Sequence, residues 1–194
     1  PQHRRQRQMC IRDRLNGELP NKKQLKDFER QERKERNLSK TLLQDIKNFP
    51  KKAHPMDVAR TAVSIMGLED KETKDNSPKA NMRKVMRIFA KTPVALAAFY
   101  RSRKGKKIIS PKKNLSFSEN FFYMCFGKVP NKDIVKAFDV SLILYAEHSF
   151  NVSTFTARTI TSSLSDIHGA ITGAIASLKG PLHGGANEEV MHMM

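Results

Sequence analysis

The chain has 194 residues, 39% of them hydrophobic, and a formal net charge of +17 at neutral pH. This length suffices for one ordinary domain, and no run of eighteen uncharged apolar residues is present, so we expect no membrane span and no membrane partner. The first residues are basic and polar with no apolar segment behind them, which argues against a secretory signal and favours a cytoplasmic location.

The first fourteen residues differ from the rest of the chain. They carry five arginines against one aspartate and show no apolar periodicity. We expect residues 1–14 to be a disordered, non-native segment that takes no part in the fold. The alternative is a disordered basic arm that belongs to the protein, and the sequence leaves both open.

Past residue 14, the pattern is one helix after another, with turn signals between them. Two surface helices are expected over residues 21–36 and 38–49, because apolar residues recur there at helical spacing. A third helix opens at His54-Pro55, where proline favours the first turn, and Gly67 is expected to end it. Residues 69–78 follow as a polar loop.

The longest helical pattern covers residues 81–103, and Pro93 is expected to interrupt it. A basic loop follows over residues 105–113, and an aromatic-rich helix over residues 116–126 stops at Gly127. Cys10 and Cys125 stand in unrelated contexts, so we expect neither a disulfide nor a metal site. Cys125 is expected to be a buried apolar side chain.

The helix over residues 133–147 is apolar on most faces, which is typical of a core helix. Two further helices are expected over residues 153–163 and 166–178. The second has a face of small residues, which favours close helix packing, as at a subunit interface. His168 on this helix is expected to lie on the surface or to pack at an interface. Because no alternating strand pattern occurs, the fold class is all-α.

One histidine, His183, stands between a Gly-Pro-Leu turn at residues 180–182 and the glycines Gly184 and Gly185, before a helix expected over residues 186–194. Proline restricts the backbone, and glycines admit close approach or backbone geometry that a Cβ would forbid. This turn is suited to presenting an imidazole to a ligand. A purely structural histidine is the alternative.

A second polar cluster, containing His148 and Asn151, follows the apolar helix. A neutral imidazole donates one hydrogen bond and accepts another, so together with an amide it could hold carboxylates. The alternative for His148 is a helix-end histidine that interacts with the last carbonyls.

Several motifs, in the same order along the chain, resemble the citrate synthase family, which includes the 2-methylcitrate synthases. The resemblance covers residues 15–194 and rests on these stretches: Asn16-Gly17-Glu18-Leu19-Pro20, His54-Pro55-Met56-Asp57, Tyr100-Arg101-Ser102-Arg103-Lys104-Gly105, Ser118-Glu119-Asn120-Phe121, 146–158, 165–166 and 173–188. It implies an all-α homodimer that condenses an acyl-CoA with oxaloacetate, with no permanently bound cofactor. Residues 15–194 would form part of the large domain.

The resemblance also implies roles for three residues. His183 matches the histidine that hydrogen-bonds the acyl thioester carbonyl as its enol forms. His148 matches the histidine that binds oxaloacetate, and Asn151 lies in the same ligand-facing segment. The family's second active-site histidine and its aspartate base lie after the stretch represented by His183, so we expect the polypeptide as given to be inactive.

Alternatives stay open at the level of substrate and partner. Residues 147–156 look somewhat like the 2-methylcitrate branch, whereas residues 180–185 are shared, so acetyl-CoA is the first hypothesis and propionyl-CoA the alternative. The basic stretch over residues 101–113 could touch CoA phosphates, although a solvated loop is the simpler interpretation. A basic nucleic-acid-binding module is a more distant hypothesis, and we expect no nucleic-acid partner because the aromatic residues follow core spacing. The third hypothesis is a structural relative of the family that has no catalytic activity.

Overall fold

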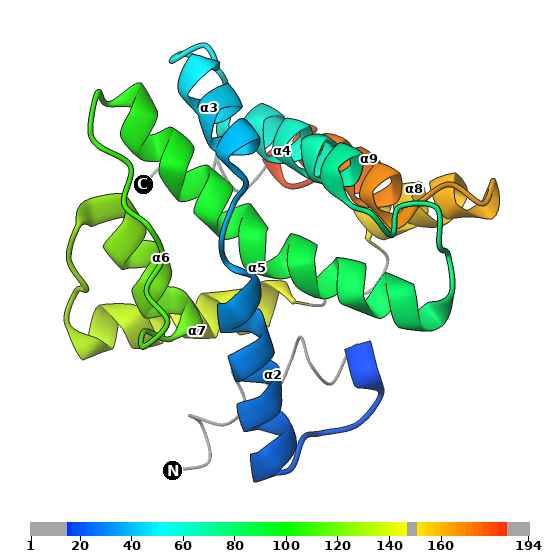
Figure 1. Ribbon diagram of the computed structural model, residues 1–194, viewed down its shortest axis with the longest axis horizontal. Coiled ribbons are helices and arrows are strands. Elements are labelled where there is room, and N and C mark those ends of the chain that lie inside the picture. The colour runs from blue at the N-terminus through cyan, green and yellow to red at the C-terminus, as the bar shows by residue number, and fades with distance from the viewer. Residues whose placement is uncertain (1–14, 147–150, 186–194) are drawn as a thin grey trace.

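The helices of the chain pack around one long central helix, α5 (Figure 1). The computed structural model describes residues 15–146 and 151–185, and the regular elements within these ranges are helical. They are α2 (Lys22–Glu35), α3 (Lys40–Asn48), α4 (Pro55–Glu69), α5 (Pro78–Arg103), α6 (Phe117–Phe126), α7 (Lys132–Tyr145), α8 (Val152–Ser162) and α9 (Ile167–Leu178). α3, α4 and α9 lie to one side of α5, and α6 and α7 lie to the other. The expected all-α class is confirmed.

Each helix begins at a side chain that accepts hydrogen bonds from backbone N–H groups of the first turn, which have no partner within the helix. The capping residues are Asn21, Ser39, His54, Ser77, Ser116, Asn131, Asn151 and Asp166. The expected start of α5 was wrong, because Ser77 caps the helix and Pro78, which we expected in the polar loop, occupies its first turn. Proline suits that position because its missing N–H would have no helical partner there.

Two residues expected to break helices do not do so. Gly67 does not end α4, which continues to Glu69. Pro93 does not interrupt α5, although it removes one helical hydrogen bond. Val94 and Ala97 are buried directly after Pro93, and this packing holds α5 continuous through the proline.

The hydrophobic core lies where α5 meets α3 and α4 on one side and α6 on the other. The first cluster consists of Leu42, Ile46, Val58, Ala62, Met66, Ala95, Ala98 and Phe99. The second consists of Val94, Ala97, Met124 and Cys125. Cys125 is therefore the buried apolar side chain that the sequence predicts, and burial raises the pKa of its thiol to about 11. A thiol with so high a pKa is a poor nucleophile at neutral pH.

The expectation that residues 133–147 form a core helix was wrong. None of the described residues of α7 is buried, and Ile134, Val140 and Leu144 are exposed. The reason is position: α7 packs chiefly against α6 within the described part of the chain, so most of its apolar faces meet no other helix there.

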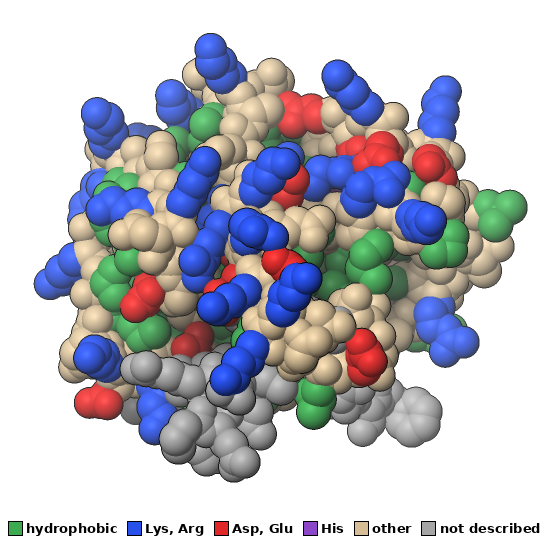
Figure 2. All heavy atoms as spheres, turned by 60° about the horizontal axis from the view of Figure 1, so that its bottom comes forward, with side chains coloured by type: hydrophobic (Ala, Val, Ile, Leu, Met, Phe, Trp, Pro, Cys, Tyr) green, Lys and Arg blue, Asp and Glu red, His purple; other side chains and the backbone are tan. Residues whose placement is uncertain are grey.

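The positive charge lies on the surface. Figure 2 shows lysine and arginine side chains spread over one face of the molecule, with aspartate and glutamate side chains between them. None of the helices in residues 15–146 and 151–185 has the length and hydropathy needed to cross a membrane.

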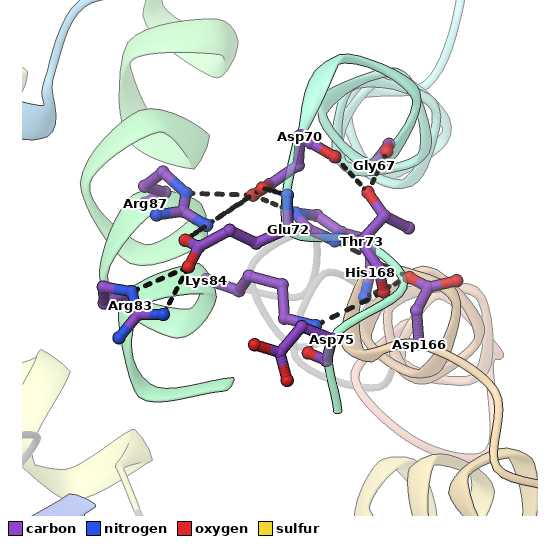
Figure 3. Close-up of polar contacts among 10 residues, drawn as sticks. All are labelled: Gly67, Asp70, Glu72, Thr73, Asp75, Arg83, Lys84, Arg87, Asp166 and His168. Carbon is purple, nitrogen blue, oxygen red and sulfur yellow. Dashed lines mark hydrogen bonds and ion pairs between the residues drawn. The ribbon is translucent and has the colours of Figure 1, made fainter. Parts of the chain in front are cut away.

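His168 is buried within this chain, with 2% of its surface exposed, so the expectation that it lies on a helix surface or packs at an interface was wrong. Its ring lies against Gly67 of α4, where a Cβ would stand 2.8 Å from the Cβ of His168. The absent side chain of Gly67 therefore lets α9 approach α4 closely enough to bury the imidazole. Figure 3 shows the ring between two carboxylates: Nε2 lies 3.5 Å from Asp70 Oδ2, and Nδ1 lies 3.6 Å from Asp166 Oδ1.

The polar loop between α4 and α5 is tied to α5 by charged groups (Figure 3). Arg87 donates to Asp70 Oδ2 at 2.9 Å and to Glu72 Oε2 at 2.7 Å, and Arg83 also donates to Glu72. Hydrogen bonds from Arg83 and Arg87 lower the pKa of Glu72 to about 2. The ammonium group of Lys84, which is fully buried, donates to the Asp75 carbonyl at 2.6 Å. This loop is thus a fixed part of the packing around His168.

Candidate functional site

A cavity of about 690 Å³ lies where α4 begins, α7 ends, α8 begins and α9 ends. Its polar lining consists of His54, Tyr145, Asn151, Ser153, Lys179 and His183. Its apolar lining includes Met56, Leu144, Leu178 and Leu182. An apolar cavity with a few convergent polar groups is the usual form of a small-molecule site. Two of the expected site residues, His183 and Asn151, therefore line one cavity, and the third, His148, lies outside the described residues.

The turn that carries His183 is packed onto the end of α9. The backbone N–H groups of His183 and Gly185 donate to the Gly180 carbonyl at 2.9 and 3.1 Å. A Cβ on Gly184 would lie 2.5 Å from the Leu178 carbonyl oxygen and 2.6 Å from Leu178 Cδ1. Close approach, the first of the two reasons expected for the glycine pair, therefore explains Gly184. The helix expected over residues 186–194 lies outside the described residues.

The imidazole of His183 is held from α8. Its Nε2 lies 2.8 Å from the hydroxyl oxygen of Ser153, which belongs to the first turn of α8. A serine hydroxyl can donate to or accept from a ring nitrogen, so this contact holds Nε2 of His183 at the start of α8. Ser153 was not among the residues predicted from the sequence. The available signal was its place two residues after Asn151, in the segment already expected to face a ligand.

Asn151 caps α8. Its Oδ1 accepts a hydrogen bond from the Thr154 N–H at 3.0 Å, while the residue also lines the cavity. The cap places the start of α8, and therefore Ser153, beside the His183 turn. Whether the Asn151 amide contacts a ligand stays a prediction.

His54 is a second histidine of the cavity lining. The sequence predicted that it begins a helix and gave it no role in binding a ligand. Its Nδ1 accepts a hydrogen bond from the Met56 N–H at 3.2 Å. A neutral imidazole that accepts at Nδ1 carries its proton on Nε2, so this hydrogen bond indicates the tautomer of neutral His54. The signal that pointed to it was the motif His54-Pro55-Met56-Asp57.

An ion pair crosses between the two helices that border the cavity. Lys179, the residue after α9, places its Nζ 2.7 Å from Oδ2 of Asp57 in the first turn of α4. The hydrogen bond from Lys179 is the main cause that lowers the pKa of the Asp57 carboxyl. Across residues 15–146 and 151–185, no group of three or more His, Cys, Asp or Glu side chains could hold a metal ion.

Comparisons with known proteins identify the family of this chain. The family model "Citrate synthase, C-terminal domain" matches residues 14–194. The 2-methylcitrate synthase of Mycobacterium tuberculosis is 49% identical over 178 residues, which cover 92% of this chain and 45% of that protein. The citrate synthase of Mycolicibacterium smegmatis is 48% identical over 179 residues, which cover 92% and 48%. The chain spans about half the length of the curated relatives it matches.

Solved structures show the same fold. The crystal structure of citrate synthase from Pyrobaculum aerophilum matches with a TM-score of 0.87 and 34% identity, over 94% of this chain and 48% of that chain. The citrate synthase of Thermoplasma acidophilum, in a ternary complex with carboxymethyl coenzyme A and oxaloacetate, matches with a TM-score of 0.88 and 27% identity, over 94% and 48%. This chain belongs to the citrate synthase family.

Proposed function

We propose that the native protein condenses an acyl-CoA with oxaloacetate and hydrolyses the resulting thioester, with the acyl-CoA as co-substrate and no permanently bound cofactor. The observation that carries this proposal is His183, held by Ser153 on the wall of a cavity large enough for a small molecule. The names of the relatives and the ligands of the Thermoplasma complex support the choice of substrates.

His183 stabilises the enol of the acyl group in this proposal. Removal of a proton next to a thioester carbonyl moves negative charge onto the carbonyl oxygen, and a positioned donor stabilises that charge as it develops. When the Ser153 hydroxyl donates to Nε2, the proton of the neutral ring resides on Nδ1, which then donates to the thioester oxygen. The 2.8 Å contact holds the ring beside α8, and a serine that donates in this contact leaves the ring proton on Nδ1.

His148 and Asn151 bind the second substrate in this proposal. Oxaloacetate carries two carboxylates and a keto oxygen, all hydrogen-bond acceptors, and an imidazole and an amide each offer N–H donors. Asn151 contributes indirectly as well, since its cap on Thr154 places the first turn of α8 beside the His183 turn.

The acyl group is acetyl in the first form of the proposal and propionyl in the second. The relatives of similar identity carry both names, 2-methylcitrate synthase and citrate synthase. One methylene in an apolar pocket is worth only about 1 to 3 kcal/mol of discrimination, so we expect turnover of both thioesters with a modest preference.

The remaining features of the proposal concern assembly. Residues 15–194 form part of the large domain of a cytoplasmic homodimer, and residues 1–14 are a non-native extension without a role in catalysis. The exposed apolar residues of α7 supply a surface that further parts of the assembly would cover.

The test is an assay of CoA release by the purified native protein, with oxaloacetate and either acetyl-CoA or propionyl-CoA. We expect turnover with both, and we expect His183→Ala to lower kcat by about 100- to 1,000-fold, the usual effect of losing one donor to a developing oxyanion. The exposed substitution Arg30→Met serves as the control. Absence of CoA release by the native protein would refute the function, and full activity of His183→Ala would refute the role of that residue.

A further inference from the structure

We infer that the ion pair between Lys179 and Asp57 is a positioning device that fixes the His183 turn against the opposite wall of the cavity. The inference rests on the proposed function and deepens it, because it names two residues that hold the reacting imidazole in place. Neither residue belongs to the chemistry of the condensation. Their effect passes through the backbone of the turn.

The turn that carries His183 is closely packed. Lys179 follows α9 directly, and its backbone N–H still donates to the Ile175 carbonyl at 3.2 Å. The Gly180 carbonyl accepts from both His183 and Gly185, and the backbone of Gly184 is in contact with Leu178. Residues 178–185 are therefore one closely packed unit, so a shift of Lys179 displaces His183 with it.

The ion pair between Lys179 and Asp57 joins two walls of the cavity. Asp57 lies in the first turn of α4, whose neighbouring residues His54 and Met56 line the cavity. Lys179 and His183 line it from the end of α9. The 2.7 Å bond between Nζ and Oδ2 therefore connects two walls that are 122 residues apart in the sequence.

Helices α4 and α9 form an antiparallel pair. The start of α9 packs against the end of α4, where His168 covers Gly67, and the end of α9 lies at the start of α4, where Lys179 meets Asp57. Figure 1 shows the two helices side by side. The two contacts thus fasten an antiparallel pair at both ends, and the Lys179–Asp57 contact is the one at the cavity.

Asp57 has a second cation that provides a matched control. Arg60 places its Nη2 2.9 Å from Oδ1 of Asp57, but Arg60 lies on α4 and makes no bridge to α9. Arg60→Gln removes a positive charge from the same carboxylate and leaves the link between the helices in place. Any effect that requires the bridge should therefore follow Lys179 and spare Arg60.

The experiment uses NMR of the full chain with labelled histidine, together with amide hydrogen exchange. We expect Lys179→Met and Asp57→Asn to shift the ring signals of His183 and to speed exchange at the His183 and Gly185 amides by about tenfold, since a local contact that limits opening is lost. Arg60→Gln should leave the His183 ring signals and the amide exchange rates unchanged. The exchanged pair Asp57→Lys with Lys179→Asp should restore them, which keeps the test decisive if a single variant folds poorly.

A kinetic readout on the native protein completes the test. A displaced catalytic group lowers kcat more than it changes KM, because misplacement by about 1 Å can cost up to 100-fold in rate. We expect Lys179→Met to lower kcat about tenfold or more with little change in the KM for acyl-CoA. His183 signals that do not respond to Lys179→Met or Asp57→Asn would overturn the inference. A wild-type protein without condensation activity, but with these NMR responses, would refute the proposed function alone.

Discussion

At the scale of single residues, the absence of one Cβ shapes the turn that presents His183. The backbone of Gly184 lies so close to the Leu178 carbonyl that even an alanine side chain has no room. The contact arises because the turn folds back onto the end of α9. The position of His183 therefore depends on the close packing of a neighbouring glycine against the end of α9.

Gly184→Ala should destabilise the chain by about 1 to 3 kcal/mol, the usual cost of inserting a methyl group into a packed contact. The Cβ would lie 2.5 Å from the Leu178 carbonyl oxygen, so the turn must move and the His183–Ser153 contact should weaken. Urea denaturation measures the first effect, and the ring signals of His183 report the second.

Gly105→Ala provides the comparison for this substitution. Gly105 has φ +65 and no atom within 4 Å of a built Cβ, so alanine there strains the backbone without displacing any neighbour. We expect a loss of stability with unchanged His183 signals. Equal disturbance of His183 by both substitutions would contradict the packing explanation.

The sequence predicted the residues whose signal is local and missed those that depend on distant partners. His183 and its glycines were recognised because proline and glycine restrict or free the backbone within a few positions. Ser153 was missed because its partner is His183, 30 residues away. His168 was placed on a surface because nothing near it in the sequence shows that Gly67 leaves it a space.

At the scale of elements, α2 is joined to the loop before α6 by a buried charged pair. Arg36, which caps the end of α2, donates to both carboxylate oxygens of Glu32 at 2.8 and 2.7 Å. The same guanidinium donates to the carbonyls of Lys112 and Leu115. Both side chains of the pair are only 2% exposed. An amphipathic surface helix was expected here, but the carbonyls that make the burial possible lie more than 70 residues away.

Arg36→Met should destabilise the chain by about 3 to 5 kcal/mol, because it leaves Glu32 buried without its partner and two carbonyls without a donor. Replacing both Glu32 and Arg36 by methionine should recover much of that loss, since no buried charge then remains. Urea denaturation gives the free energies of unfolding, and amide exchange at residues 112–115 reports the release of the loop.

Arg30→Met is the matched control on the same helix. Arg30 pairs with Asp27, but its side chain is 80% exposed, and such surface pairs contribute about 1 kcal/mol or less. A loss after Arg36→Met no larger than that after Arg30→Met would show that the buried pair does not anchor the loop.

At the scale of the whole molecule, the sequence predicted the fold class and the order of the helices but not their burial. Capping side chains and helical spacing are local, and they correctly located all the helices from α2 to α9 within a few residues. The expected burial of α7 was wrong, because burial depends on what surrounds Ile134 and Val140 and not on their own hydrophobicity. The site follows the same rule: the turn was predictable, whereas the wall formed by α4 was not.

The network around His168 should make the stability of the whole chain depend on pH in two separate windows. His168 faces Asp70 from the loop after α4, Asp166 at the start of α9, and Lys84 and Arg87 from α5. Burial lowers the pKa of His168, and this effect exceeds the opposing influence of the two carboxylates. The unfolded chain therefore binds a proton near pH 6.5 while the folded chain does not. The free energy of unfolding should therefore be unaffected by protonation of His168 above that pH. It should fall as the pH drops towards the pKa that His168 has in the folded chain.

The expected slope in this upper window is at most about 1.4 kcal/mol per pH unit, the value for one proton. His168→Gln should flatten the slope between pH 7 and the folded pKa, measured by urea denaturation at successive pH values. Glu72→Gln should keep this slope and change only the lower window, because the pKa of Glu72 is lowered from 4.5 to about 2 and its stabilisation is lost as the pH falls through that range. A slope that survives His168→Gln would assign the upper window to another group and leave the buried imidazole without a part in acid sensitivity.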